Sequence, residues 1–301
     1  MSFKIAVCIT FHYNKQREAF LIEVVEGLKT IQASIELTII CNEIPNDLKN
    51  LLKVFSTDNF KLDFFIPKGL GHPYLLSWSH YLIFKSKLSD INISHFLYLE
   101  DDLKFTKNNF NYWVKSRGIL KDLNGYPAFF RYEKNNSFKQ YSTDVPEPMS
   151  IYDCKVIGTS CGDYFINIVY PYQGMYLYDR ELMLEYFNSP SFNPDFDHGI
   201  FNSLFASKPF NIREKAALGL TYLNIPKGFR SRTFLPYNQK ENILESECLI
   251  HHIPNNYTQD NSSPYGKIEI NGIFKKKTTN LFLNHAIKLF LKTILRQILK
   301  K

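Results

Sequence analysis

Residues 95–102, HFLYLEDD, decide the fold, because an apolar run ends there in three consecutive acids, Glu100, Asp101 and Asp102. A short, aromatic-rich apolar run of this kind predicts a buried strand. Three adjacent carboxylates repel one another unless a cation or solvent relieves the repulsion. We therefore expect the triplet to face a cleft, where its hard oxygen ligands suit Mg²⁺ or Mn²⁺. The alternative is a solvated turn in which Asp101 caps the next helix.

Strands and helices alternate in the sequence that leads up to this triplet. Such alternation predicts an α/β fold with a mostly parallel sheet and helices on both faces. Ligands of these sheets bind beyond the carboxyl ends of the strands, so the loops after the predicted strands should converge with the triplet. The predicted strands are residues 4–10, 36–41, 61–66 and 95–99, and the predicted helices are residues 18–31, 47–55 and 74–88.

The second half of the chain is less regular. Residues 133–164 are rich in Asn, Ser, Asp and Pro, which indicates loops. We expect a helix over residues 176–188 and strands over residues 218–225 and 248–252. No linker separates two independent units, so the sequence predicts a single large domain.

Composition and charge exclude several classes of protein. The 301 residues are 45% hydrophobic and 22% charged, which is typical of a globular chain. The five cysteines form no CxxC pair, which argues against a disulfide scaffold and favours a reducing compartment. The net charge is +7, but eight cations and no acids follow Glu269, so residues 1–274 carry a net charge of −1. A nucleic-acid-binding face on the body of the protein is therefore not expected.

The C-terminal residues 279–301 have a basic amphipathic pattern. Lys288, Lys292, Arg296 and Lys300 recur every four residues beside an apolar stripe. This pattern predicts a helix that lies on an anionic membrane surface, although a helix docked on its own domain would show the same pattern. The sequence shows neither a signal peptide nor a run of 18 apolar residues. We therefore expect a cytoplasmic protein, peripheral at the inner face of the cell membrane.

Residues 96–113, FLYLEDDLKFTKNNFNYW, resemble the metal-site segment of the N-acetylglucosaminyltransferase I family. Members of that family are inverting glycosyltransferases of the GT-A fold, and their segment likewise joins an apolar strand, an E-D-D triplet and an aromatic helix. Similarity extends patchily over residues 69–84, 170–187 and 193–201. In the last of these segments Asp197-His198 stands where the family has two acids in tandem.

The resemblance implies a metal-dependent catalytic domain of the GT-A type. Asp102 would contact Mn²⁺ or Mg²⁺ directly, while Glu100 and Asp101 would reach the ribose, the donor sugar or metal-bound water. In several GT-A enzymes a late histidine completes the metal site, and His251 is the candidate here, with a surface histidine pair as the alternative. Residues 1–105 would form the nucleotide-binding half of the domain, residues 106–274 its acceptor-side half, and residues 275–301 a membrane-associating tail. The side chains expected to hold the nucleoside, or else to be ordinary loop residues, are His12, Tyr13, Asn42 and Glu43.

Inversion at the sugar requires a carboxylate that removes the proton of the acceptor hydroxyl. Asp197 matches the family's base position, and Asp195 is the second candidate or a helix N-cap. Gly174 lies in a turn that would let backbone approach the donor sugar, or in a plain turn. Arg230 and Arg232 follow a glycine and would form a lid on the diphosphate, an exposed basic loop being the alternative.

The leading hypothesis is a glycosyltransferase that moves a sugar from a nucleotide-diphosphate sugar, favourably a UDP-sugar, to a glycan or lipid-linked acceptor. Synthesis of a cell-surface polysaccharide such as lipopolysaccharide or capsule would be its setting. A second hypothesis is a sugar nucleotidyltransferase. Such an enzyme would need a glycine-rich basic loop after the first strand, but the segment there, FHYNKQR, has no glycine. The third reading, a non-catalytic membrane-surface binding protein, leaves the acidic triplet unexplained.

Overall fold

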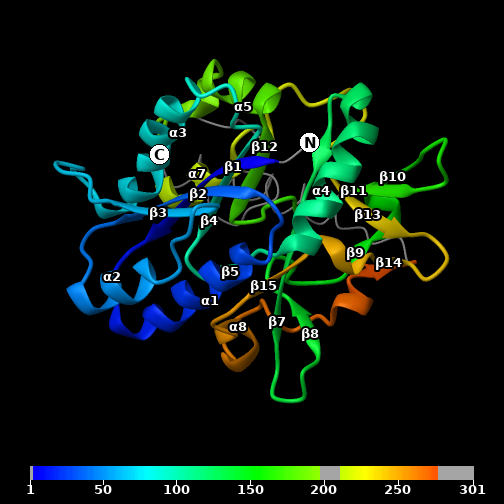
Figure 1. Ribbon diagram of the computed structural model, residues 1–301. Helices are drawn as coiled ribbons and strands as arrows, with labels where there is room; N and C mark the ends of the chain where they lie inside the picture. The colour runs from blue at the N-terminus through cyan, green and yellow to red at the C-terminus, as the bar shows by residue number, and fades with distance from the viewer. Residues whose placement is uncertain (1–2, 197–210, 277–301) are drawn as a thin grey trace, which may run out of the picture.

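The computed structural model describes residues 3–196 and 211–276. Its main sheet has five strands in the order β12-β4-β1-β2-β3, and all neighbours are parallel except β12, which runs antiparallel to β4 (Figure 1). These strands confirm the α/β prediction and the four strands expected in the first half. Their bounds are β1 Lys4–Phe11, β2 Ser34–Cys41, β3 Phe60–Phe65, β4 His95–Glu100 and β12 Met175–Asp179.

Helices cover both faces of this sheet. Figure 1 shows α1 (Glu18–Lys29) and α2 (Asn46–Lys53) on one side and α3 (His80–Lys87) and α5 (Arg180–Phe187) on the other. The change of side follows from the strand order. Connections between parallel strands are right-handed, so the helices between β1, β2 and β3 lie on one face of the sheet. The connection from β3 back to β4 runs in the opposite direction across the sheet, so its helix lies on the other face. Covered on both faces, β1 and β4 are almost entirely buried, which explains their continuous apolar sequence.

The second half adds smaller sheets and α4 (Lys107–Leu120) around the same core. A single large cluster of buried side chains extends from Ile5 to Phe274, so the described residues form one domain. One small sheet contains β10 Lys155–Gly158, β11 Tyr164–Asn167, β13 Thr233–Asn238 and β14 Ile243–Leu244, with β6 Tyr126–Pro127 beside β13. Another contains β5 Leu103–Lys104, β15 Leu249–His252, β7 Phe130–Lys134 and β8 Gln140–Ser142, and β9 Met149–Ser150 pairs with β16 Phe274–Lys275. The remaining α-helices in the described ranges are α7 Ile212–Leu218 and α8 Asn256–Gln259.

Three sequence predictions require correction. The helix expected over residues 176–188 begins only at Arg180, because the alternating aromatic residues before it form β12 and Asp179 caps the helix by accepting from the Leu182 amide. The strand expected over residues 218–225 is wrong, since α7 ends at Leu218 and turns follow. The helix expected over residues 74–88 is divided into a 3-10 helix, η2 (Pro73–Ser79), and α3. The strand expected near residue 250 is confirmed as β15.

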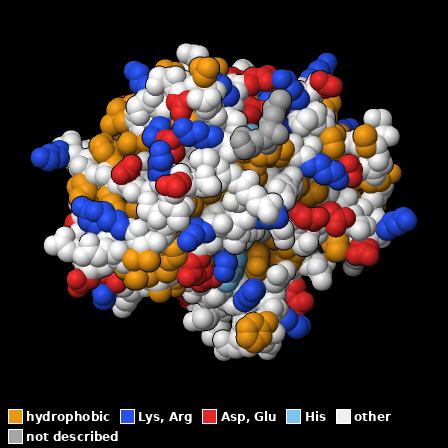
Figure 2. All heavy atoms as spheres, viewed as in Figure 1, with side chains coloured by type: hydrophobic (Ala, Val, Ile, Leu, Met, Phe, Trp, Pro, Cys, Tyr) orange, Lys and Arg blue, Asp and Glu red, His pale blue; other side chains and the backbone are white. Residues whose placement is uncertain are grey.

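The surface carries mixed charge. Figure 2 shows Lys and Arg side chains interspersed with Asp and Glu across the face in view, as expected for a body with a net charge near zero. No helix within residues 3–196 and 211–276 is long and apolar enough to cross a membrane. The basic C-terminal pattern of residues 279–301 lies outside the described residues.

Candidate active site

The acidic triplet lies where the sheet reverses its strand order. β1 and β4 are neighbours, and Thr10 is in register with Glu100 at their carboxyl ends. A cavity of about 590 Å³ opens there, lined by all three acids of the triplet and by side chains of the loop after β1. This is the position at which α/β sheets bind ligands, so the predicted cleft is present. The acids themselves are more buried than expected for strand-end side chains, with Asp101 4% and Asp102 5% exposed.

Arg17 relieves part of the repulsion within the triplet. Its Nε donates to Asp101 Oδ2 at 2.8 Å, and its Nη2 lies 2.7 Å from both Asp101 Oδ1 and Asp102 Oδ2. A fork of this shape suits a pair of carboxylates. Asn14 caps the short 3-10 helix Lys15–Arg17 and so fixes the start of the arginine's segment. The sequence prediction missed this residue, although it is the arginine of the loop after the first strand.

His252, rather than His251, lies beside Asp102. Its Nε2 is 3.5 Å from Asp102 Oδ2, and its Nδ1 is 2.7 Å from Oε1 of the fully buried Glu133. Successive side chains of a strand point to opposite faces, so His251 on β15 is directed elsewhere. Its ring stacks on Tyr132, and its Nε2 lies 3.1 Å from Asn255 Oδ1. The assignment of His251 to the site is therefore wrong for this geometry.

The surroundings set the charge states of these groups in opposite directions. Burial alone would lower the pKa of His252, but hydrogen bonds to Asp102 and Glu133 raise it to about 9. Burial would raise the pKa of Asp102, yet His252 and Arg17 hold that pKa well below its usual range. The pKa of Glu100 is raised by burial and by the neighbouring Asp102. Asp102 is thus the most firmly ionised acid of the triplet.

Two more arginines reach the cavity. Arg131 on β7 is held by Asp144, whose Oδ1 accepts from the arginine Nε at 3.0 Å, and its guanidinium lies 5.0 Å from the centroid of the Tyr172 ring. Arg213, in the first turn of α7, has its Nε 3.9 Å from Glu100 Oε1. With Arg17, these side chains give the cavity three permanent positive charges that the sequence prediction did not assign.

Gly174 supports this arrangement from behind Arg131. It has φ +65°, and a Cβ built on it would lie 3.0 Å from Arg131 Nη1 and 3.2 Å from Leu103 Cδ1. Glycine is therefore required for both conformation and space. Within the described structure the close neighbour of Gly174 is Arg131, and its approach to a donor sugar remains a prediction.

The loop after β1 lies as predicted. His12 and Tyr13 line the cavity. Asn42 does not line it, but its Oδ1 accepts from the Tyr13 amide at 2.7 Å and so fixes the loop. Glu43, which follows Asn42 at the end of β2, is outside the lining set. The nucleoside roles of these four residues remain predictions.

The predicted arginine lid is wrong in this structure. Arg232 is 1% exposed, and its Nη1 and Nη2 lie 2.6 and 2.9 Å from the Glu185 carboxylate. Arg230 donates from Nε to the Asp153 carbonyl at 2.8 Å, and neither arginine lines the cavity. The arginines that line the cavity are Arg17, Arg131 and Arg213 instead.

Of the two acids predicted as the catalytic base, the structure describes Asp195 but not Asp197. The Asp195 amide donates to Asn193 Oδ1 at 2.9 Å, and the residue is not among those that line the cavity. Asp197 lies outside the described residues, so its role as the base remains a prediction.

The cavity fits a cation that takes few protein ligands. Within the described ranges, no group of three or more His, Cys, Asp or Glu side chains is arranged to hold a metal ion. Asp102 Oδ1, however, is buried and has no hydrogen-bond partner there. Mg²⁺ is commonly held by one or two carboxylates, with phosphate oxygens and water completing its shell. The donor set therefore suits an ion that arrives with a phosphorylated ligand.

Comparison with known proteins gives partial likenesses of fold. No protein-family model and no curated protein matches the chain. A solved structure assigned as a nucleotide-diphospho-sugar transferase of Desulfovibrio desulfuricans G20 is 12% identical over 44% of this chain and 59% of its own, with a TM-score of 0.29. The glycosyltransferase GlyE of Streptococcus pneumoniae TIGR4 is 17% identical over 44% of this chain and 30% of its own, with a TM-score of 0.26. A CMP:2-keto-3-deoxy-manno-octonic acid synthetase in complex with CTP is 12% identical over 61% of this chain and 77% of its own, with a TM-score of 0.34. At such low TM-scores these likenesses support no statement about function.

Proposed function

We propose that this protein is a metal-dependent, inverting glycosyltransferase of the GT-A type that uses a nucleotide-diphosphate sugar, with a UDP-sugar as the favoured donor. One observation carries the proposal: the E-D-D triplet lines a cavity at the point where the sheet reverses its strand order, together with three arginines and His252. A site of this charge pattern suits a diphosphate and a divalent cation together.

Arg213 is the proposed diphosphate contact. Arg131 is already neutralised by Asp144, and Arg17 is engaged by two carboxylates. Arg213 has a side chain that is 56% exposed, and its ion pair within the described residues is a 3.9 Å contact with Glu100, so that part of the chain leaves most of its donors to a ligand. Its place in the first turn of α7 puts it at the cavity wall.

Asp102 is the proposed ligand of Mn²⁺ or Mg²⁺, which when bound would neutralise the charge of the leaving diphosphate. The chain's own residues prepare this carboxylate. Arg17 and His252 both approach Oδ2, which leaves Oδ1 unpartnered in the described structure. Glu133 accepts a hydrogen bond from the opposite ring nitrogen of His252 and fixes the ring, as a carboxylate does behind many histidines of metal sites.

Asp197 is the proposed base, on sequence grounds. The described carboxylates that line the cavity are the triplet and Glu214. Glu214 Oε2 accepts from the Asn211 amide in the capping box of α7, so it is committed to the helix end. The acceptor is proposed to be a glycan or lipid-linked molecule at an anionic membrane, in synthesis of a surface polysaccharide such as lipopolysaccharide or capsule, because of the basic pattern of residues 279–301.

A hydrolysis panel of nucleotide sugars with and without Mn²⁺ tests the proposal, since slow donor hydrolysis needs no acceptor. We expect metal-stimulated hydrolysis of at least one UDP-sugar, abolished by Asp102→Asn and retained by Asp58→Asn, a change at an exposed acid remote from the triplet in the sequence. Release of pyrophosphate from a nucleoside triphosphate and a sugar 1-phosphate would instead indicate a nucleotidyltransferase. Absence of both activities, with no Mn²⁺-dependent binding of UDP in calorimetry, would favour a non-catalytic role.

A further inference from the structure

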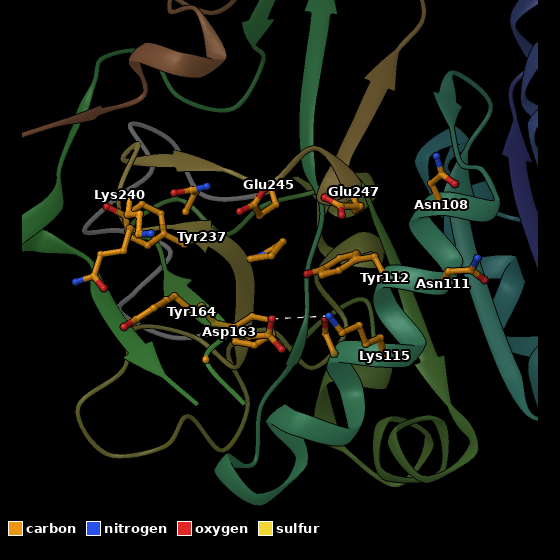
Figure 3. A pocket seen from close by; sticks show the side chains of 16 residues that line it. Asn108, Asn111, Tyr112, Lys115, Asp163, Tyr164, Tyr237, Lys240, Glu245 and Glu247 are labelled. Carbon is orange, nitrogen blue, oxygen red and sulfur yellow. Dashed lines mark ion pairs between the residues drawn. The ribbon is translucent and has the colours of Figure 1, made fainter. Parts of the chain in front are cut away.

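A second cavity, of about 870 Å³, lies between α4 and the sheet that contains β11 and β13. We call it the α4 cleft and define it by Asn111 and Lys115 of α4, Tyr164 of β11, and Glu245 and Glu247 before β15. It shares no lining residue with the cavity at the acidic triplet. Figure 3 shows Asn111 and Lys115 extending from the helix on one side and Tyr164 on the other, with the Lys115–Asp163 ion pair between them.

The walls of the α4 cleft are fixed by buried hydrogen bonds. Asn109, on the buried side of α4, donates from Nδ2 to the carbonyl of Glu247 at 2.9 Å and to that of Leu249 at 3.0 Å. Tyr112 donates from its hydroxyl to the Ala128 carbonyl at 3.0 Å. These bonds fix α4 against the segment before β15, so one corner of the α4 cleft is held by buried contacts.

Some of the polar side chains that line the α4 cleft are unengaged, whereas the hydroxyls of Tyr112 and Tyr237 donate to protein oxygens. Within the described structure the side-chain amides of Asn108, Asn111 and Gln239 form no hydrogen bond with the protein, and the Lys115–Asp163 pair is loose at 3.7 Å. Tyr164 is 40% exposed, and it lies opposite Gly158, where a Cβ would be only 3.1 Å from the ring. The absence of a side chain at Gly158 thus lets the tyrosine ring rest against the neighbouring strand.

The charges exclude one class of ligand. Two lysines face three carboxylates in the α4 cleft, and the described lining contains no arginine and no histidine, whereas three arginines and His252 line the cavity at the triplet. Phosphate or another anion is therefore disfavoured. Amides and carboxylates that donate to or accept from hydroxyl groups, beside an accessible aromatic ring, suit a neutral molecule rich in hydroxyl groups.

We propose that the α4 cleft is a binding site for a neutral saccharide, separate from the catalytic cavity. The inference does not rest on the proposed function. If the protein is also a glycosyltransferase, the α4 cleft would hold a remote part of a glycan rather than the reacting sugars.

The test is saturation-transfer NMR and calorimetry on the full chain with neutral trisaccharides built from glucose, galactose or N-acetylglucosamine. We expect at least one to bind, with affinity lowered about tenfold or more by Tyr164→Ala and by Asn111→Ala, about 1.4 kcal/mol or more. Tyr152→Ala is the matched control, because Tyr152 is 68% exposed and lies outside the α4 cleft. Saturating UDP with Mn²⁺ should leave saccharide binding unchanged.

Three results would overturn the proposal. The first is the absence of binding by any trisaccharide in the panel. The second is binding that survives both Tyr164→Ala and Asn111→Ala or that UDP displaces, which would place the saccharide elsewhere. The third is a result in which no saccharide binds but spermidine does, and in which Glu245→Gln and Glu247→Gln abolish the binding of spermidine. This would make the α4 cleft a cation site. Unchanged thermal melts of the variants show that loss of binding is not loss of fold.

Discussion

Gly174 and Arg131 lie so close that a Cβ on the glycine would come within 3.0 Å of the arginine Nη1. The contact links the start of β12 to β7 and positions a buried guanidinium in the wall of the cavity at the acidic triplet. Since Arg131 cannot retreat from Asp144 without breaking a buried ion pair, the glycine side of the contact has to remain empty.

Gly174→Ala is therefore expected to weaken binding of UDP with Mn²⁺ by about tenfold, because it pushes Arg131 from its place in the cavity wall and so changes the shape of the proposed UDP site. Gly228→Ala is the control, since Gly228 has φ +89° and open space where its Cβ would be. Both variants should lose about 1–2 kcal/mol of stability from the positive φ. Calorimetry separates the two effects, and equal UDP affinities in the two variants would contradict the role given to Gly174.

His252→Gln and His251→Gln form a matched pair on adjacent positions of β15. We expect the first to lower Mn²⁺-dependent affinity for UDP, because Asp102 loses the neighbour that holds it ionised and oriented. The second should change it little, since His251 contacts Tyr132 and Asn255. The affinity of each variant for UDP is measured by titration at a series of Mn²⁺ concentrations. A larger loss of affinity in His251→Gln than in His252→Gln would instead place His251 in the site.

Asp197→Asn keeps size and polarity but cannot accept a proton. Turnover should fall by roughly 10²–10⁴ while donor affinity stays similar. Asp195→Asn is the comparison, and we expect it to retain activity because Asp195 is not among the cavity residues. An inactive Asp195→Asn beside an active Asp197→Asn would assign the base to the other acid.

Two buried histidines should make the fold sensitive to acid. Burial lowers the pKa of His80 and of His95 to about 4 each, from an ordinary value of 6.5. The folded state then binds fewer protons than the unfolded state between pH 6.5 and 4, so stability falls as the pH is lowered through this window. For His80, which is fully buried, the loss at pH 4 is on the order of 3 kcal/mol. Urea unfolding of the wild type and His80→Phe at pH 7 and pH 4.5 measures it, and an identical pH dependence in both would refute the assignment.

Removal of residues 279–301 should release the protein from anionic vesicles while sparing donor hydrolysis in solution. The expectation follows from the cations and apolar stripe of that segment, and the candidate catalytic residues all precede it. Binding by the intact chain should weaken as salt is added. Co-sedimentation with vesicles provides the measurement. Aggregation of the shortened chain or loss of its cooperative melt would show that the segment belongs to the core.

The first half of the fold and the place of the site were predictable because their signals are local. Short apolar runs predicted the four parallel strands. The run that ends at Glu100 also predicted the position of the cleft, because the acidic triplet follows it directly. The strand β12 was not predictable, because it follows from pairing with β4 and its sequence continues directly into a helix. Tertiary pairing overrode the helical spacing of residues 176–188.

The partners of the triplet were missed for a similar reason. Arg131 comes from β7 and Arg213 from α7, and only the folded chain brings them to the end of β4. The choice between His251 and His252 depends on which face of β15 points to Asp102, and two adjacent histidines carry no such information. Glu133, buried behind His252, gave no signal in the sequence beyond its place in an alternating strand.

The pairing of β12 with β4 also bears on how the chain acquires its structure during synthesis. Leu97 pairs with Leu177, so one edge of β4 has no neighbour until the ribosome has delivered the residues of β12. Residues 1–105 then present one unpaired edge of the apolar six-residue strand β4, and such an edge can pair with other chains. Because residues 1–105 and the later strand β12 share one sheet, a fragment that ends at residue 105 should aggregate rather than fold.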